Sequence, residues 1–366
     1  MTRDRAASGA ASGAASGAAS GAASGAAFHM APGLAIQNRV RTASGQSPQS
    51  TRPRLLRRID PEADVLPAPS DVVELMATLT ARDVGILASI RQYRYLNVDQ
   101  LHRLFFDSQR RAQARTQWLR EHHLLHRWAA SDISTLHRLP SVFSVSPRGA
   151  GVLAACQDQP SRPHVERARH ARDHCFHMVH DLEANGFFVD LAAACIHLRE
   201  VGLYHWVGEE DCRRRFRAEL APDGWGRLLT PAGEVLFFLE WDRGTESPAR
   251  IAAKASSYLS YFADKEAADL NHVLFVAPGP AREESIRSVI DHLLPGGVTT
   301  CTFSVTHAER LAVDGSIGAI WRRAEGDGDR ISILDLPPRP RSLRPIADCI
   351  AKPDWWERRP GGGAGA

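Results

Sequence analysis

The chain has 366 residues, 24% of them charged and 43% hydrophobic, and its formal net charge of +3 at pH 7 does not by itself indicate a nucleic-acid partner. Its six cysteines form no CxxC pair or zinc-ribbon spacing, so they predict reduced thiols in a cytoplasmic protein and exclude a disulfide framework. No apolar run reaches the length of a membrane span and the N-terminus lacks the apolar core of a secretion signal, so we expect neither insertion nor export.

A low-complexity segment opens the chain. The Ala-Ser-Gly repeat that runs to about Ala27 has almost no surface to bury, and residues 32–70 continue without an apolar period. We therefore expect residues 1–70 to form a disordered tail and linker. The second half of this segment is basic, which fits either a solvated linker or an arm that contacts phosphate groups. The arginines concerned are Arg39, Arg41, Arg52, Arg54, Arg57 and Arg58.

Residues 78–158 show a pattern of three helices followed by two strands and a short helix. Thr80 can cap the first helix, and Asp83 at the third position can complete a capping box with it. The order is similar to that of a winged helix-turn-helix domain, whose third helix enters the DNA major groove. The expected elements are helices that begin after Thr80, Asn97 and Ser108, strands at 125–128 and 136–146, and a short helix over 147–156.

The third of these helices is rich in arginine and glutamine. Both side chains pair with base edges or contact phosphates, so the helix predicts a reader of double-stranded DNA. Ala114 and Trp118, with Leu119 or Leu125, are expected to face the core. The alternatives are the solvated face of a small helical domain and a surface for another protein. The expected DNA-binding residues are Arg110, Arg111, Gln113, Arg115, Gln117 and Arg120.

A single helix is expected from Arg167 to about Ala194. One stripe of this helix carries histidines and an acid at helical spacing, which fits either zinc ligands or a surface that faces solvent or the winged helix. Glu183 falls on the apolar side, where a carboxylate needs a partner, unless it lies at the edge and reaches water. The stripe comprises His170, His174, His177 and Asp181.

The apolar run at 235–239 predicts a strand buried on both faces of a sheet, because it is too short for a typical helix. Side chains alternate along a strand, so Glu240 and Asp242 emerge on one face at its end. Asp223 follows a proline and precedes a glycine, and on a neighbouring strand it would complete a carboxylate cluster. Such a cluster is costly without a cation, and its oxygens suit Mg²⁺ or Mn²⁺.

Lys254 lies at the edge of the packed face of a helix that is expected to begin near residues 247–248. From there its ammonium group can reach the carboxylates and stabilise negative charge on phosphate. The alternative for each of these residues is structural. Asp223 would cap a turn, Glu240 and Asp242 would form an exposed strand end, and Lys254 would be a surface side chain with a packed stem.

The remaining pattern supports an α/β sheet with helical crossovers over residues 165–325. Strands are expected at 272–277 and 299–306, with a helix at 282–294 between them. Residues 330–366 are rich in proline, arginine and glycine and are expected to be a mobile tail.

The order Asp223, Glu240 and Lys254 resembles the PD-(D/E)xK nuclease superfamily. The resemblance implies that the two acids bind the metal and that Lys254 is the catalytic lysine, relocated to the next helix. The position where the family usually carries lysine holds Asp242, which would add a metal ligand instead. Because the first helix of such folds often contributes an acid, Glu183 is implied as an accessory metal ligand.

From Thr80 to Arg323 the chain resembles the replication-relaxation family of bacterial plasmids and mobile elements. The resemblance rests on the winged-helix pattern and on residues 180–188, 222–224 and 237–245, followed by Lys254 and Tyr258. It implies plasmid replication and relaxation of plasmid DNA, with double-stranded DNA and other replication or mobilisation proteins as partners. His180 and Asn185 match the family pattern without an assigned role.

Two classes of function follow from these features. In the first, the winged helix positions duplex DNA and the carboxylate site nicks or cleaves it with Mg²⁺. In the second, the nuclease-like fold is catalytically silent and the protein is a DNA-binding replication, copy-control or transcription factor. Asp242 stands where the family usually has lysine, which favours the second class. Lys254 could supply the missing positive charge from the next helix and so partly restores the first class.

Overall fold

The computed structural model describes residues 60–128, 141–173, 177–196, 198, 200–263, 271–294, 301–326 and 328–340. The expected N-terminal tail up to residue 59, residues 129–140 between the wing strands, and the tail beyond residue 340 lie outside these ranges. Ordered structure begins earlier than the sequence predicts, with the 3-10 turn η2 at Pro61–Asp64 and helix α1 at Pro69–Thr78. It also continues later, because Ile333 and Leu336 are buried.

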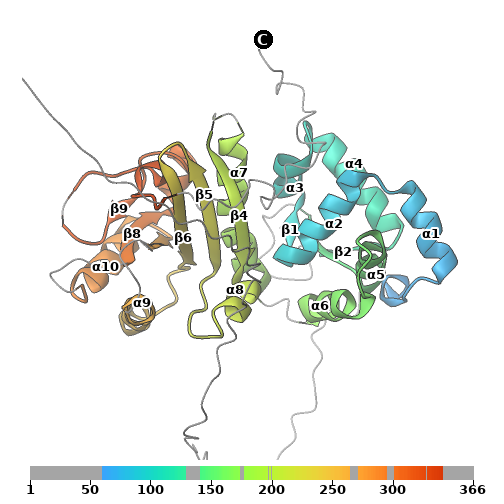
Figure 1. Ribbon diagram of the computed structural model, residues 1–366, viewed down its shortest axis with the longest axis horizontal. Helices are drawn as coiled ribbons and strands as arrows, with labels where there is room; N and C mark the ends of the chain where they lie inside the picture. The colour runs from blue at the N-terminus through green and yellow to red at the C-terminus, as the bar shows by residue number, and fades with distance from the viewer. Residues whose placement is uncertain are drawn as a thin grey trace, which may run out of the picture. The chain divides into compact units, whose positions relative to one another are not determined.

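The three predicted helices of the N-terminal part are present (Figure 1), and Thr80 caps the first of them as predicted. Thr80 and Asp83 form a capping box at the start of α2, and Asn97 forms one with Gln100 at the start of α3. The Ser108 side chain accepts from the backbone N–H of Arg111 at the start of α4. These helices are α2 at Ala81–Tyr93, α3 at Val98–Phe105 and α4 at Gln109–Glu121.

A small antiparallel sheet packs beside these helices. It has the order β1-β3-β2, with β1 at Leu96–Asn97, β2 at Leu125–Trp128 and β3 at Val142–Val145. The sequence pattern predicted β2 and β3 but not β1, which is too short to show a period. Helix α5, at Pro147–Cys156, follows β3 with Ser146 as its N-cap.

The expected single helix from Arg167 to Ala194 is wrong, because two helices occupy this region. Helix α6, at Ser161–Asp173, packs against α5 and β3 of the small sheet. Helix α7, at Met178–Cys195, packs against β4, β5 and β6 of the large sheet and also contacts α3 and β1. His177 lies at the N-cap of this second helix.

The large sheet has six strands in the order β4-β5-β6-β7-β8-β9 (Figure 1). Strands β6, β7 and β8 run parallel to one another, and the other neighbours pair antiparallel. Strand β6 is interior and is buried along nearly its whole length, as its apolar run predicted. The strands are β4 at Gly202–Gly208, β5 at Gly224–Thr230, β6 at Gly233–Trp241, β7 at Asn271–Ala277, β8 at Cys301–His307 and β9 at Arg322–Arg323.

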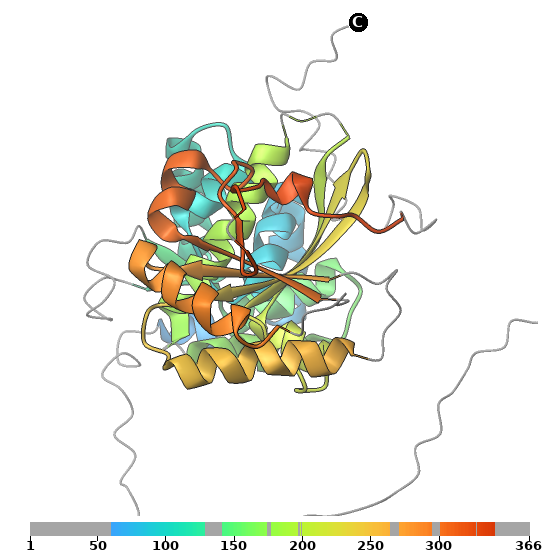
Figure 2. The same cartoon turned by 90° about the vertical axis from the view of Figure 1, so that its left-hand side faces the viewer.

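Helices cover both faces of this sheet. On one face, Phe237 and Leu239 of β6 belong to the same apolar cluster as α7 and α11. On the other face, Leu236 and Phe238 pack with α9 and α10. Figure 2 shows the golden α9 and the orange α10 on one side of the strands and the red-orange α11 on the other. The helices are α8 at Glu209–Arg215, α9 at Pro248–Phe262, α10 at Pro280–Asp291 and α11 at Ala308–Asp314, and the 3-10 turn η7 at Ile333–Asp335 follows.

Helix α7 joins the N-terminal helices to the large sheet. The Asn185 side chain donates hydrogen bonds of 3.0 Å to the carbonyl oxygens of Tyr93 and Tyr95 at the end of α2. The Tyr93 ring in turn stacks on Trp206 of β4, with 3.6 Å between ring centroids. Among the described residues, one apolar cluster extends from the N-terminal helices through α7 to one face of the large sheet.

Candidate functional site

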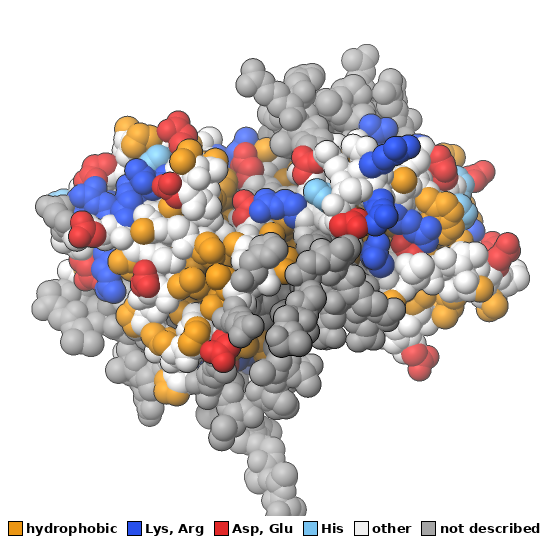
Figure 3. All heavy atoms as spheres, turned by 90° about the horizontal axis from the view of Figure 1, so that it is seen from above, with side chains coloured by type: hydrophobic (Ala, Val, Ile, Leu, Met, Phe, Trp, Pro, Cys, Tyr) orange, Lys and Arg blue, Asp and Glu red, His pale blue; other side chains and the backbone are white. Residues whose placement is uncertain are grey.

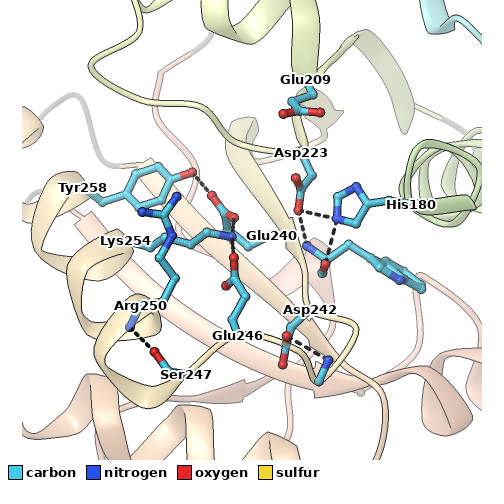
Figure 4. Close-up of polar contacts among 12 residues, drawn as sticks. His180, Glu209, Asp223, Glu240, Asp242, Glu246, Ser247, Arg250, Lys254 and Tyr258 are labelled. Atoms are coloured by element: carbon cyan, nitrogen blue, oxygen red, sulfur yellow. Dashed lines mark hydrogen bonds and ion pairs between the residues drawn. The ribbon is translucent and has the colours of Figure 1, made fainter. Parts of the chain in front are cut away.

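Glu240, at the carboxyl end of β6, is the centre of a polar cluster on the face covered by α9 (Figure 4). It is 2% exposed, and both of its carboxylate oxygens have a partner. The Lys254 Nζ lies 2.9 Å from Oε2, and the Tyr258 hydroxyl donates to Oε1 at 2.6 Å. Burial raises the pKa of the Glu240 carboxyl, although the charge of Lys254 acts in the opposite direction.

Lys254 reaches this carboxylate from α9, whose N-cap is Ser247, as the sequence pattern predicted. Its ammonium group also lies 3.0 Å from Glu246 Oε1. Burial alone would lower the pKa of Lys254, but the charges of Glu240 and Asp223 outweigh burial and raise it. The lysine is therefore a fixed cation between two carboxylates, with 21% of its side chain exposed.

Asp223 precedes β5 and lies beside Glu240. Its backbone N–H donates to the Leu239 carbonyl at 3.0 Å, and its Oδ2 accepts from the Trp241 N–H at 2.7 Å. Its negative charge helps to raise the pKa of Glu240, which places the two carboxylates within electrostatic reach of each other. Gly224 fixes this end of β5 against α7, because a Cβ there would come within 2.4 Å of the Phe188 ring.

His180 of α7 completes the environment of Asp223. Its Nε2 lies 3.0 Å from the Trp241 carbonyl oxygen and 3.4 Å from Asp223 Oδ2. Burial acts to lower the pKa of His180, but the hydrogen bond and charge of Asp223 outweigh it and raise the pKa to about 9. The imidazole is thus a cation at neutral pH that donates to the end of β6.

Two of the predicted metal ligands lie apart from Asp223 and Glu240. Asp242 directly follows the last residue of β6, and its carboxylate is held by Arg282 and by the Gly244 N–H (Figure 4). Glu183 pairs with Arg243 at 3.2 Å. Each carboxylate therefore has its own cation. The Asp242 backbone N–H continues the bonding to β7 with a 2.9 Å hydrogen bond to the Val276 carbonyl, and Arg282 belongs to α10, which covers the same sheet face as α9.

A second acidic group lies on the side of Asp223 that faces α2. Asp181 pairs with Arg94 at 3.2 Å, and both line a small cavity together with Glu209 and Asp223. Burial raises the pKa of Asp181 to about 6, with Arg94 opposing the shift. Asp181 was predicted only as part of a histidine stripe, because the contact with Arg94 joins segments far apart in the sequence.

The zinc hypothesis gains no support from the described residues. His174 lies outside them, and His170 and His177 belong to different helices. Within the described part of the chain, no three His, Cys, Asp or Glu side chains are grouped so as to hold a metal ion. A cation at Asp223 and Glu240 would therefore have two protein carboxylates and otherwise water or phosphate oxygens, a ligand set that Mg²⁺ commonly accepts.

Helix α4 presents a different group of predicted residues. Its buried side chains are Ala112, Thr116 and Leu119, so the expectation that Ala114 faces the core is wrong. Arg110, Arg111, Gln113 and Gln117 are exposed on the outer face, and Arg120 is half-buried.

Arg115 does not belong to the outer face of α4. Its guanidinium forms a two-bond contact with the buried Asp83 and lies over the Trp118 ring. Arg111 pairs with Asp107 but keeps 68% of its side chain exposed. Figure 3 shows basic side chains in several separate groups with acidic side chains among them, so the surface seen there has no single continuous basic patch.

Comparison with known proteins supplies one match. The model of the replication-relaxation family matches residues 87–275, which is just over half of the chain. No curated protein and no solved structure matches. The matched range covers α3 and α4, the three strands of the small sheet and α7. It also covers Asp223, Glu240 and Lys254 with the strands and helix that position them. Among the described residues, no helix is long and apolar enough to cross a membrane.

The His180–Asp223 contact predicts a pH-dependent contribution to stability. The pKa of His180 is about 9 in the folded chain and about 6.5 when unfolded, so the contribution is complete below about pH 6.5 and is lost as the pH rises through about 9. We expect up to about 3 kcal/mol of the free energy of unfolding to disappear over this range. Urea unfolding in EDTA should show a steeper alkaline decline for wild type than for His180→Gln. Parallel profiles would contradict the contact.

Proposed function

The chain belongs to the replication-relaxation family, and on that premise we propose that it binds duplex DNA and nicks or cleaves it with Mg²⁺. The observation that carries the proposal is the buried Glu240 carboxylate, held by Lys254 and placed beside Asp223 at the end of a central strand. This arrangement is similar to a PD-(D/E)xK nuclease core in which the lysine comes from the following helix. The family supports a role in the replication or relaxation of plasmid or mobile-element DNA.

The α4 region supplies the proposed duplex-binding surface. Helices α2, α3 and α4 followed by the antiparallel β2 and β3 form the order of a winged helix-turn-helix domain. The exposed Arg110, Arg111, Gln113 and Gln117 suit contacts with phosphates and base edges in a major groove. Arg115 is removed from the proposed DNA-binding residues, because its two bonds to Asp83 hold the start of α2.

The carboxylate site supplies the proposed chemistry. Asp223 and Glu240 would hold Mg²⁺ or, in its place, Mn²⁺. Their donor set fits, since each Glu240 oxygen keeps a lone pair after one hydrogen bond and Asp223 contacts Trp241 and His180 through Oδ2. When bound, such an ion lowers the pKa of coordinated water and polarises a phosphodiester. Lys254 would stabilise the negative charge that develops on the phosphate, because its ammonium is fixed and only partly solvated.

Two further residues orient the acids. Tyr258 is fully buried, its hydroxyl donates to Glu240, and burial raises the pKa of that hydroxyl. His180 holds Asp223 and the Trp241 carbonyl in the same way from α7. Both residues thereby fix the spacing of the two carboxylates before DNA arrives.

One observation favours the second class of function, a catalytically silent DNA-binding replication or copy-control factor. Both Glu240 oxygens already have a donor in Lys254 and Tyr258, so the carboxylate is neutralised without a metal ion. In that case the ion pair is a structural feature of the sheet. Cleavage assays separate the two classes directly.

Lys254→Ala should abolish nicking of supercoiled plasmid by the full chain in Mg²⁺ while leaving duplex affinity nearly unchanged. Loss of one electrostatic contact in such a site typically costs about a hundredfold or more in rate. Lys254→Arg should restore little activity, because a planar guanidinium does not replace a compact ammonium. Conversion of supercoiled to open-circular plasmid on agarose gels measures the rate.

Asp291→Asn, an exposed carboxylate on α10, is the matched control for Asp223→Asn. Asp291→Asn should nick plasmid at the wild-type rate, and Asp223→Asn should not nick it. Equal rates for wild type and Lys254→Ala would remove the lysine from the chemistry. If the wild-type chain fails to nick plasmid with every divalent metal that is tested, the silent DNA-binding factor is the function that remains.

Arg110→Ala should weaken duplex binding by the full chain and reduce its salt dependence. One lost phosphate contact lowers the slope of log affinity against log salt by about 0.9. Arg162→Ala, an exposed arginine of α6, is the control and should leave affinity and slope unchanged. Identical slopes for Arg110→Ala and wild type would exclude this face of α4 from DNA binding.

Arg115→Ala should instead lower the free energy of unfolding, because it leaves Asp83 buried without its cation.

A further inference from the structure

An open groove lies on the sheet face that carries Glu240. It has about 620 Å³ of empty volume, and its walls come from α8, β5, β6 and the last turn of α9. Strands β5 and β6 define its position, because Trp225 pairs with Phe238 and Arg227 pairs with Leu236. Side chains on this face recur every second residue, so the groove begins about 7 Å along the strands from Asp223 and Glu240.

The groove combines guanidinium groups with aromatic rings. The Arg215 guanidinium lies over the Trp225 ring at 4.6 Å, and among the described residues no carboxylate is within ion-pair distance of it. The Phe216 and Tyr261 rings meet edge to face, with 6.0 Å between centroids, and both are only partly buried. The groove therefore has flat apolar surfaces beside an uncompensated positive charge.

Arginines on the opposite wall add to this charge. Arg227 and Arg339 both contact one carboxylate, Glu234, at 2.8 and 3.5 Å. Together with Arg215, these two arginines line the groove with guanidinium groups. A ligand that complements these groups carries repeated negative charge and exposed flat rings. Bases in a duplex are stacked inside it, so the chemistry selects a single strand.

We propose that this groove binds single-stranded nucleic acid, with bases stacked on Tyr261, Phe216 and the Arg215 guanidinium and with phosphates at the arginines. The groove lies on the same sheet face as Asp223 and Glu240, so a strand bound there lies on the face of the proposed cleavage site. This relation to cleavage rests on the proposed function. Binding itself does not, because it needs neither metal nor cleavage.

The test measures the affinity of the full chain for a fluorescent oligothymidylate of about 15 nucleotides by anisotropy in EDTA. Arg215→Ala should weaken binding about tenfold and lower the slope of log affinity against log salt by about 0.7, the value for one single-strand phosphate contact. Tyr261→Leu should weaken binding at least about fivefold without a change in slope, since it removes only a stacking surface.

Arg213→Ala is the matched control, because Arg213 is an exposed arginine of the same helix that pairs with Glu209. It should bind as wild type, and Arg215→Ala should keep wild-type affinity for duplex DNA. An abasic oligomer of the same length should bind more weakly than oligothymidylate. The proposal is overturned if Arg215→Ala and Arg213→Ala bind alike, or if the abasic oligomer binds as well as oligothymidylate.

Because the binding assay contains no metal ion, it can succeed or fail independently of the cleavage assay. If oligothymidylate binds and plasmid is never nicked, the groove stands and the proposed cleavage fails. If nicking occurs and oligothymidylate affinity is unaffected by Arg215→Ala and Tyr261→Leu, the cleavage site stands and the groove proposal fails.

Discussion

The burial of the Glu240 carboxylate is the constraint on which the rest of the site depends. An ionised carboxylate inside a sheet is strongly unfavourable unless a cation and hydrogen-bond donors surround it. Lys254 and Tyr258 meet this need from successive turns of α9, so the helix must pack in one register on β6. Asp223 lies beside Glu240, and its negative charge is balanced by His180 of α7. Removal of either cation would leave an acid without compensation.

Helix α7 links this site to the proposed DNA-binding region. Its first turn carries His180 and its middle carries Asn185, which holds the end of α2. Between them, Gln100 of α3 donates to the Leu182 carbonyl at 2.8 Å. A helix bonded to both regions fixes α2 and α3 relative to β6. Duplex DNA on α4 would therefore be presented to the carboxylates by a rigid connection.

Local signals in the sequence predicted much of this structure. The Thr80 cap, the helix starts at Asn97 and Ser108 and the apolar run of β6 depend only on neighbouring residues, and each is present. The approach of Lys254 to Glu240 followed from element order. Contacts between distant segments were not predictable in this way. The Arg115–Asp83 pair and the role of His180 depend on tertiary packing, and the split between α6 and α7 depends on which surface each helix covers.

The central claim is that Asp223 and Glu240 together form a cation site. Electron paramagnetic resonance of Mn²⁺ titrated into the full chain counts bound ions directly, without DNA or cleavage. The account predicts one site in wild type and in Glu183→Gln, because Glu183 is held by Arg243. It predicts loss of that site in Asp223→Asn. Retention of Mn²⁺ by Asp223→Asn, or no binding by folded wild type, would contradict the account.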